Sequence, residues 1–283
     1  MSDQQLSQNI EQLLVARNLR DMQLARSALQ PGYYLRAARL LYQCTGTVLI
    51  GTGFPVSRSF ETDGPVGAMA LYQSLSALGA HPIIACGAPL SQALSSEYRV
   101  LELKARDMQS ARTEANEQLQ TLQPQIVIAI EHPGLAADGR YYNMRREDIT
   151  ARCSFFDPFI TQARCPTIAI GDGGNEIGMG NIVEALSALN ISTSITRCDE
   201  LLVSDVSNWG SYGLIAFLAL WAQRDLLAEI SPINLLNYLS ARGSVDGVTR
   251  ANTLTEDGLQ AREGLQVIAQ LRGLTGMSCE TQS

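Results

Sequence analysis

The sequence predicts an α/β fold in which a doubly wound, mostly parallel sheet has helices on both faces. Short apolar runs of strand length alternate with longer helical segments, which is typical of parallel strands buried on both faces. Polar and glycine-rich residues follow directly after several of these runs, where a parallel sheet places its ligand-binding loops. We therefore expect a three-layer, Rossmann-like architecture.

Six runs rich in β-branched residues are predicted as strands: residues 47–51, 81–86, 126–130, 167–170, 192–196 and 201–204. Helices are predicted over residues 65–78, 110–122, 214–227 and 256–271, and another is expected to run from a glycine-rich loop through residue 189. Asp63 is the expected N-cap of the helix over 65–78, with Pro65 in its first turn.

The N-terminal segment is predicted as amphipathic helices over residues 4–43 that break at Pro31-Gly32 and cover one side of the sheet. No repeat, low-complexity tract or flexible linker divides the rest of the chain. We therefore expect residues 1–283 to form a single α/β domain, with a helical segment at about 1–43 packed on it.

Composition narrows the classes of partner. A hydrophobic content of 46% and a charged content of 17% are typical of a soluble globular protein. A net charge of −7 without a cluster of Lys and Arg argues against nucleic acid and anionic membranes as partners. No apolar run approaches membrane-spanning length and no signal peptide is recognisable, so a cytoplasmic location is expected. A homo-oligomer is left open.

The cysteines and histidines of the sequence do not indicate a metal site or redox chemistry. The chain has six cysteines without a C-x-x-C pair, and only two histidines, His81 and His132. Free thiols are the better interpretation than a zinc site. Both histidines are expected to be structural, with His132 as a hydrogen-bonded imidazole in a loop.

The loop after the run 167–170 is the strongest candidate for a site. Residues 167–181 read TIAIGDGGNEIGMGN, which predicts a strand, a glycine turn and the start of a helix. The loop lacks the Lys-Ser/Thr ending of a P-loop and is not G-x-G-x-x-G. Its two carboxylates, Asp172 and Glu176, argue against phosphate. They suit an ammonium group, a metal ion or proton transfer.

Other polar residues follow the neighbouring strands. Glu131 comes directly after the run 126–130, and residues 205–208 follow the last predicted strand. Residues 131–150 are predicted as a long loop or hairpin, with a tight turn at Asp138-Gly139, and loops of this length are uncommon unless functional. We expect these loops to converge on one crevice at the carboxyl ends of the strands.

Arginines in the loops are candidates for binding a carboxylate. Arg58 lies just ahead of the helix predicted over 65–78, where a guanidinium and helix N–H groups can hold an anion together. Arg145 and Arg146 lie in the long loop, and Arg250 follows a predicted turn at Asp246-Gly247.

Each of these residues also has a structural interpretation, which the sequence leaves open. Asp172 and Glu176, four residues apart, could share one face of a helix or simply complement its dipole. Glu131 could have a pKa raised by burial or be a solvated loop acid. Arg58 could be surface charge, and Arg145 and Arg146 could form salt bridges within a hairpin.

Several sequence blocks in order carry a family resemblance. The blocks ETDGPVGA, EHPGLAADGRYYNMRREDIT, IAIGDGGNEIGMGN, VSNWGSYG and SVDGVTR resemble those of the D-glutamate cyclase family, in the domain long catalogued as of unknown function. The likeness extends from about residue 30 to the C-terminus. It implies an enzyme that converts D-glutamate to 5-oxo-D-proline and water. In the animal mitochondrial enzyme this domain is the C-terminal half of a fusion, and here a stand-alone version is expected.

The chemistry of the candidate residues supports a mechanism without a nucleotide or other cofactor. We expect Asp172, Glu176 and Glu131 to act as acids and bases, and backbone N–H groups of Gly173 and Gly174 to stabilise an oxyanion. The full set of residues expected to bind the amino-acid substrate is Gly173, Gly174, Asn175, Arg58, Asp63, Arg145 and Asn208.

Two alternatives belong to other classes. A metal-dependent hydrolase or lyase would use Mg²⁺ or Mn²⁺ held by Glu131, Asp172, Glu176 and Asp205. A non-catalytic amino-acid-binding protein would hold the ligand without turnover.

Overall fold

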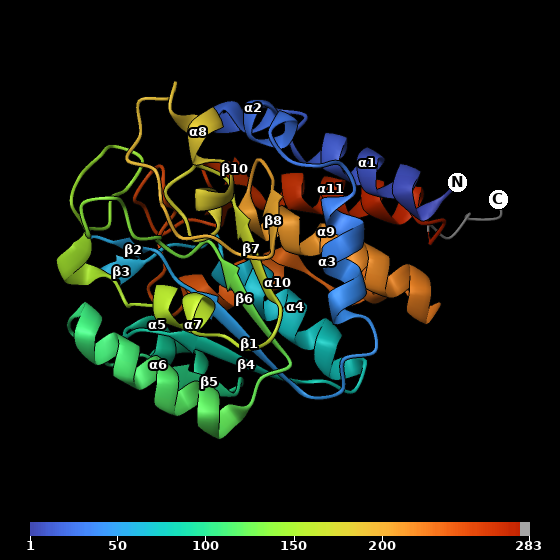
Figure 1. Ribbon diagram of the computed structural model, residues 1–283. Coiled ribbons are helices and arrows are strands. Elements are labelled where there is room, and N and C mark those ends of the chain that lie inside the picture. The colour runs from blue at the N-terminus through green and yellow to red at the C-terminus, as the bar shows by residue number, and fades with distance from the viewer. Residues whose placement is uncertain (278–283) are drawn as a thin grey trace.

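A six-stranded parallel sheet forms the centre of the molecule, in the strand order β5-β4-β1-β6-β7-β8 (Figure 1). The structure is a computed structural model and describes residues 1–277. The strands are β1 Thr47–Thr52, β4 His81–Cys86, β5 Val100–Glu102, β6 Ile126–Ile130, β7 Thr167–Gly171 and β8 Glu200–Val203. Every pair of neighbours is parallel. The predicted fold class is confirmed.

Helices lie on both faces of this sheet (Figure 1). One layer contains α3 (Tyr33–Leu41), α4 (Pro65–Ala77) and α9 (Ser207–Ala222), with α1 (Asp3–Leu14) and α11 (Ala261–Leu274) packed outside it. The other face carries α6 (Met108–Leu122) and α7 (Asp157–Thr161). The first thirteen residues of α9 are all buried, because the helix is enclosed by α3, α4 and α11 and by the sheet. One hydrophobic core extends from Leu6 to Leu271.

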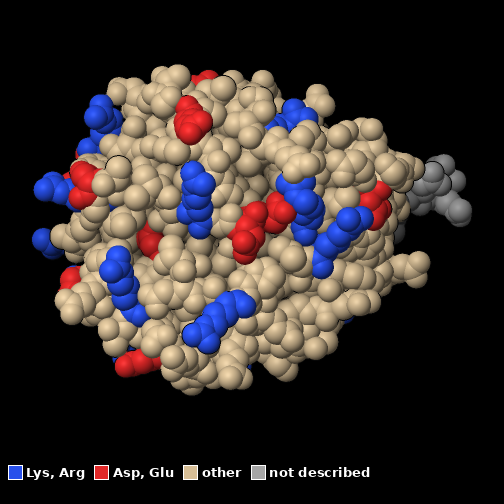
Figure 2. Space-filling view, in the orientation of Figure 1, with Lys and Arg blue, Asp and Glu red and all other residues tan. Residues whose placement is uncertain are grey.

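Smaller elements complete the chain. They are α2 (Met22–Ser27), α5 (Leu90–Leu94), α8 (Val183–Leu186), α10 (Pro232–Ser240), and the hairpins β2 Pro55–Val56 with β3 Ser59–Phe60 and β9 Thr255–Glu256 with β10 Leu259–Gln260. Among the described residues, no helix combines the length and apolar character that crossing a bilayer requires. On the face seen in Figure 2, acidic and basic side chains are interspersed.

Several predicted elements differ from the observed ones, and one strand was not predicted. The glycine-rich loop is not followed by a helix through residue 189, because a 3₁₀ turn at Met179–Asn181 leads only into the short α8. Residues 192–196 contain a single bridge, from Ser194 to Ala136, instead of a strand. The edge strand β5 was not predicted, and α11 begins at Ala261, after the hairpin β9-β10 has taken up residues 255–260.

The N-terminal helices contain a break that the sequence did not predict. After α1 the chain turns through residues 15–21, and Asn18, Arg20 and Asp21 have φ values of 54°, 51° and 59°. Left-handed backbone is uncommon for residues other than glycine and persists only where surrounding contacts hold it. This turn carries Arg20 into the interior of the molecule.

The N-termini of α4 and α9 are capped reciprocally. Asp63 was predicted as the N-cap of α4, but the N-cap is Gly64, and the Asp63 carboxylate instead accepts hydrogen bonds from the Ser207 and Asn208 N–H groups of α9 at 2.9 and 2.7 Å. In return, the Asn208 side-chain oxygen accepts from the N–H groups of Gly64 and Gly67 at 2.9 and 2.7 Å. Each helix therefore depends on the other for its cap.

We expect Asn208→Ala to destabilise the fold by about 2–3 kcal/mol, because it leaves buried N–H groups of α4 without acceptors. Denaturant unfolding measures the change. Asn237→Ala, at an exposed position of α10, is the matched control and should change stability by less than about 0.5 kcal/mol. Equal effects of the two substitutions would contradict the capping role of Asn208.

Candidate active site

A cavity of about 340 Å³ opens at the carboxyl ends of the central strands. The strand order runs from β1 to β4 and β5 in one direction and to β6, β7 and β8 in the other. The switch point therefore lies between β1 and β6, and sheets of this kind bind ligands in the crevice beside it. The lining includes Glu131, directly after β6, and Asp172 and Glu176, after β7.

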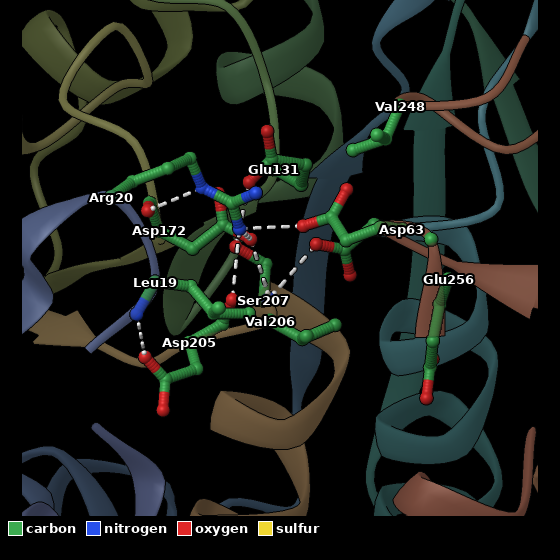
Figure 3. Close-up of polar contacts among 12 residues, drawn as sticks. Leu19, Arg20, Asp63, Glu131, Asp172, Asp205, Val206, Ser207, Val248 and Glu256 are labelled. Atoms are coloured by element: carbon green, nitrogen blue, oxygen red, sulfur yellow. Dashed lines mark hydrogen bonds and ion pairs between the residues drawn. The ribbon is translucent and has the colours of Figure 1, made fainter. Parts of the chain in front are cut away.

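Three buried carboxyl groups meet beneath this cavity. Glu131 and Asp172 line it, whereas Asp63, which was predicted to bind substrate, does not. Oxygen atoms of Asp63, Glu131 and Asp172 all lie within 4.8 Å of one another. The N-terminus of α9 holds them together, since the Ser207 N–H donates to Asp63 at 2.9 Å and to Asp172 at 3.2 Å, and the Ser207 hydroxyl donates to Glu131 at 2.6 Å. Figure 3 shows the three acids directed toward Ser207. The positive end of the helix dipole favours this concentration of negative charge.

The Arg20 guanidinium lies among these acids and supplies the buried positive charge (Figure 3). It forms ion pairs with Asp172 at 2.7 Å and with Asp257, in the turn between β9 and β10, at 2.6 Å. It also donates to the backbone oxygens of Asp172 and Asp205, at 2.9 and 2.8 Å. Arg20 thus connects the N-terminal turn, the loop after β7 and the C-terminal hairpin.

Asp205 holds the turn that presents Arg20. Its carboxylate accepts from the backbone N–H groups of Arg17 and Leu19, both at 2.8 Å, and its own N–H donates to Leu14 at 2.7 Å. Asp205 does not line the cavity. It was predicted as an alternative metal ligand, and the structure places it behind Arg20 as a support for the left-handed turn.

Burial sets the ionisation of the acids. Loss of water raises the pKa of Glu131 and of Asp172 well above the usual range for carboxyl groups, and raises that of Asp63 to about 6. Arg20 opposes this shift at Asp172, whereas Glu176 and Asp63 reinforce it at Glu131. Glu131, Asp257 and Asp63 also raise the pKa of Asp172, so both acids favour the neutral form more than an ordinary carboxyl group does, and Arg20 counteracts this at Asp172.

The glycine-rich loop orients Glu176 through its backbone. The N–H of Gly174 donates to the Glu176 carboxylate at 2.7 Å, and that of Gly173 also bonds to it. Neither glycine lines the cavity, and these N–H groups, predicted to stabilise an oxyanion, instead bind Glu176. Asp172 and Glu176 share no helix face, since the segment between them is a turn with Gly174 at φ +111°.

The long loop over residues 131–150 forms a wall of the cavity. A turn at Asp138-Gly139 and a bridge between Tyr142 and Asp148 confirm the predicted hairpin character. Asn175 donates to the Tyr142 backbone oxygen at 2.9 Å, which ties this loop to the glycine-rich loop. Asn175 is one of the residues that line the cavity, and its fully buried side-chain oxygen has no hydrogen-bond partner among the described residues.

Arginines surround the mouth of the cavity. Arg145, Arg152 and Arg250 are exposed and line it, and Arg250 pairs with Glu147 at 3.0 Å. The site therefore has a buried acidic floor and a basic rim. A molecule that carries an ammonium group at one end and carboxylates at the other matches this polarity.

Some residues predicted to bind substrate lie elsewhere. Asn208 donates to Glu256 at 2.7 Å and caps α4, and it does not line the cavity. Arg58 occupies the turn between β2 and β3, so strand β3 separates it from the N-terminus of α4. It lines a neighbouring cavity. His132 is a buried loop imidazole, bonded to Ser154 and to the Pro133 backbone oxygen, as expected.

Sequence reasoning missed five charged residues that line the cavity, namely Arg20, Glu61, Glu147, Arg152 and Asp257. Arg20 lay within a segment that was expected to be helical, and its local sequence gives no sign of the turn. Asp257 was assigned to a helix, although Asp257-Gly258 is a turn signal that could have revealed the hairpin β9-β10. Glu61 is buried, and loss of water raises its pKa.

Fold and site together define a Rossmann-like α/β protein with an acidic pocket at the switch point of its sheet. The profile of the family described as "D-glutamate cyclase-like, C-terminal" matches residues 10–272. The chain therefore belongs to this family, which confirms the resemblance seen in the sequence blocks.

The chain is also similar to individual proteins. It is 33% identical over 199 residues to the human protein "D-glutamate cyclase, mitochondrial", a match that covers 61% of this chain and 32% of the human protein. An exopolyphosphatase-related protein from Bacteroides fragilis aligns with a TM-score of 0.42 at 10% identity, covering 88% of this chain and 58% of that one. The latter likeness is too low to bear on function.

We expect Arg20→Met to destabilise the protein by about 3 kcal/mol near neutral pH, because it leaves buried carboxylates without their cation. This loss of stability should become smaller as the pH falls. Without Arg20, the folded state holds the Asp172 proton more tightly than the unfolded state does, so stability is retained at low pH and declines as the pH rises.

Unfolding midpoints measured across the pH range test this expectation. Arg17→Met is the control, since Arg17 pairs with Glu263 at a more exposed position and its loss should cost less than about 1 kcal/mol. A pH-independent effect of Arg20→Met would contradict the electrostatic role.

Proposed function

We propose that this protein converts D-glutamate to 5-oxo-D-proline and water by acid–base catalysed lactam formation. Family membership supports the reaction class. The observation that carries the proposal is the pair of buried acids with different neighbours, Asp172 bound to Arg20 and Glu131 bound only to a hydroxyl. When the environments of two carboxyl groups give them different pKa values, one can act as the acid and the other as the base of the same site.

The polarity of the cavity supports a glutamate-like substrate. We place the substrate ammonium toward the acidic floor, where the Asn175 side-chain oxygen is a buried acceptor without a partner. The α-carboxylate then extends toward the rim, where Arg145 and Arg250 can bind it, while the γ-carboxyl group folds back toward the ammonium and Glu131. Arg58, expected from the sequence to anchor the α-carboxylate, lines the other cavity, so the rim arginines take its place in this proposal.

The reaction needs a base, an acid and a folded substrate. Asp172 removes a proton from the ammonium, and the resulting amine attacks the γ-carboxyl carbon. Glu131 protonates the leaving oxygen, which departs as water after a second proton from the nitrogen reaches it. Two protons leave the nitrogen and two reach the departing oxygen, so no cofactor is required. Enclosing glutamate in its ring-forming shape supplies proximity.

A metal-dependent hydrolase or lyase is the second candidate. It is favoured by the approach of Asp63, Glu131 and Asp172 oxygens within 4.8 Å, a spacing compatible with shared ligation of one hard cation such as Mg²⁺ or Mn²⁺. In that case Asp63 replaces Asp205 in the ligand set expected from the sequence, and Arg20 would compete with the cation for Asp172.

Incubation with D-glutamate or L-glutamate, followed by NMR detection of 5-oxoproline, tests the proposed reaction. Glu131→Gln should lower turnover by at least ~100-fold while retaining the fold, because glutamine resembles the neutral carboxyl group in shape. Asp172→Asn and Glu176→Gln should also abolish turnover. Glu184→Gln, at an exposed position, is the control and should retain activity.

Full activity in Asp172→Asn would end this mechanism, and full activity in Glu176→Gln would exclude a role for Glu176 in it. Binding of D-glutamate without 5-oxoproline formation by the wild-type protein would instead identify a non-catalytic amino-acid-binding protein.

The pH dependence of turnover should follow the two acids. Activity requires Glu131 to be protonated, so kcat/KM should hold to a higher pH than an ordinary carboxyl group allows and then fall as Glu131 ionises. Activity should also fall at low pH, as Asp172 becomes protonated. In Glu131→Gln the residual activity should lose the decline at high pH. A decline that persists in this variant would exclude Glu131 as the acid.

Chelation separates the two candidate functions. The cyclase mechanism predicts that EDTA treatment followed by desalting leaves turnover unchanged. Loss of activity that Mg²⁺ or Mn²⁺ restores would favour the metal-dependent enzyme, and binding of Mn²⁺ should then weaken in Asp63→Asn.

A further inference from the structure

A second cavity of about 320 Å³ lies beside the acidic site, at the carboxyl ends of β1 and β4. Gly53 and Gly87, which directly follow these two strands, form part of its lining. The cavity shares Phe54, Pro55, Ser57 and Arg152 with the acidic site. The proposed reaction makes no use of it.

The second cavity is lined by basic residues, whereas the floor of the first cavity is acidic. Arg58, Arg106 and Arg152 line it, and no carboxylate does so among the residues that the structure describes. The whole chain has 28 acidic and 21 basic residues, so an acid-free wall with three arginines is unlike its average surface. Three converging guanidinium groups are suited to an oxyanion with more than one negative charge.

The acids close to Arg106 in the sequence, Glu102 and Asp107, accept hydrogen bonds from other groups. Asp107 follows Arg106 directly, but its carboxylate accepts from the Ser110 N–H at 2.8 Å as the N-cap of α6. Glu102, at the end of β5, accepts from the Ser91 hydroxyl at 2.8 Å. Within residues 1–277, neither Arg58 nor Arg106 forms a side-chain hydrogen bond or ion pair, while Arg152 donates to the Ser57 backbone oxygen at 3.4 Å.

Three serines line the cavity together with the arginines, namely Ser57, Ser59 and Ser154. The Ser59 hydroxyl donates to the Gly243 backbone oxygen and the Ser154 hydroxyl is bonded to His132, so Ser57 supplies the hydroxyl without such a partner within residues 1–277. The Ser57 backbone has φ 53°, within the turn that presents Arg58. The combination of guanidinium and hydroxyl donors around a hollow of this size is the chemistry that proteins use for phosphate and polycarboxylate groups.

We propose that this second cavity binds a compact anion with two or more negative charges, with Arg58 and Arg106 as its main ligands. The bound group is either a phosphate or a polycarboxylate, since both present several oxygens to guanidinium groups. The inference does not rest on the proposed cyclase reaction. It also gives Arg58 a role that differs from the substrate anchor expected from the sequence.

Titration calorimetry with inorganic phosphate, and separately with citrate, tests this site at constant ionic strength maintained with chloride. The wild-type protein should bind at least one of the two anions, and the one that binds identifies the source of the oxyanion. Arg106→Ala and Arg58→Ala should each weaken that binding by roughly tenfold or more. Arg112→Ala removes the same charge from an exposed position on α6 that lines neither cavity, and it should bind as the wild type does.

Three outcomes would overturn the proposal. The first is that the wild type binds neither anion up to ~10 mM. The second is that Arg106→Ala binds as tightly as the wild type, and the third is that Arg112→Ala weakens binding as much as Arg106→Ala does. Circular dichroism of each variant controls for folding. Turnover of D-glutamate, measured separately, should be unchanged in Arg106→Ala, so failure of the cyclase reaction and failure of the anion site give different results.

Discussion

The Arg20 guanidinium is the charge on which the acidic site depends. Asp63, Glu131 and Asp172 are buried within 4.8 Å of one another, a concentration of acid that no folded protein keeps fully ionised without a cation. Arg20 meets Asp172 and Asp257 together, and Asp205 holds its turn from behind. Because the turn is left-handed at three residues, the contacts that satisfy Arg20 also compensate for an unfavourable backbone.

The site combines two ways of controlling charge. Helix α9 presents its N–H groups to Asp63 and Asp172, while Arg20 compensates part of the remaining negative charge. Within residues 1–277 the Glu131 carboxyl group accepts a hydrogen bond from the Ser207 hydroxyl alone, and its burial favours the neutral form. The two acids thus have different partners, since only Asp172 is paired with the Arg20 guanidinium among these residues.

The sequence predicted the sheet well because its strands are signalled locally. The runs at β4 and β6 were placed at their observed bounds, since buried parallel strands are short, apolar and flanked by breakers. Glu131, Asp172 and Glu176 were found because they follow such strands directly. Arg20 could not be found this way, because its position is determined by Asp205 and Asp257, 185 and 237 residues further along the chain. Asn208 was misassigned for a related reason, since its partners at Gly64 and Gly67 belong to another helix.

The 237 residues between Arg20 and Asp257 have a consequence for the order in which the molecule matures during synthesis. The strands and α4 have all been made before the hairpin β9-β10 leaves the ribosome, yet until then Arg20 lacks one of its two carboxylate partners. The acidic pocket is therefore complete only after residue 257 has been made. A nascent chain can bury its sheet earlier than it completes this pocket.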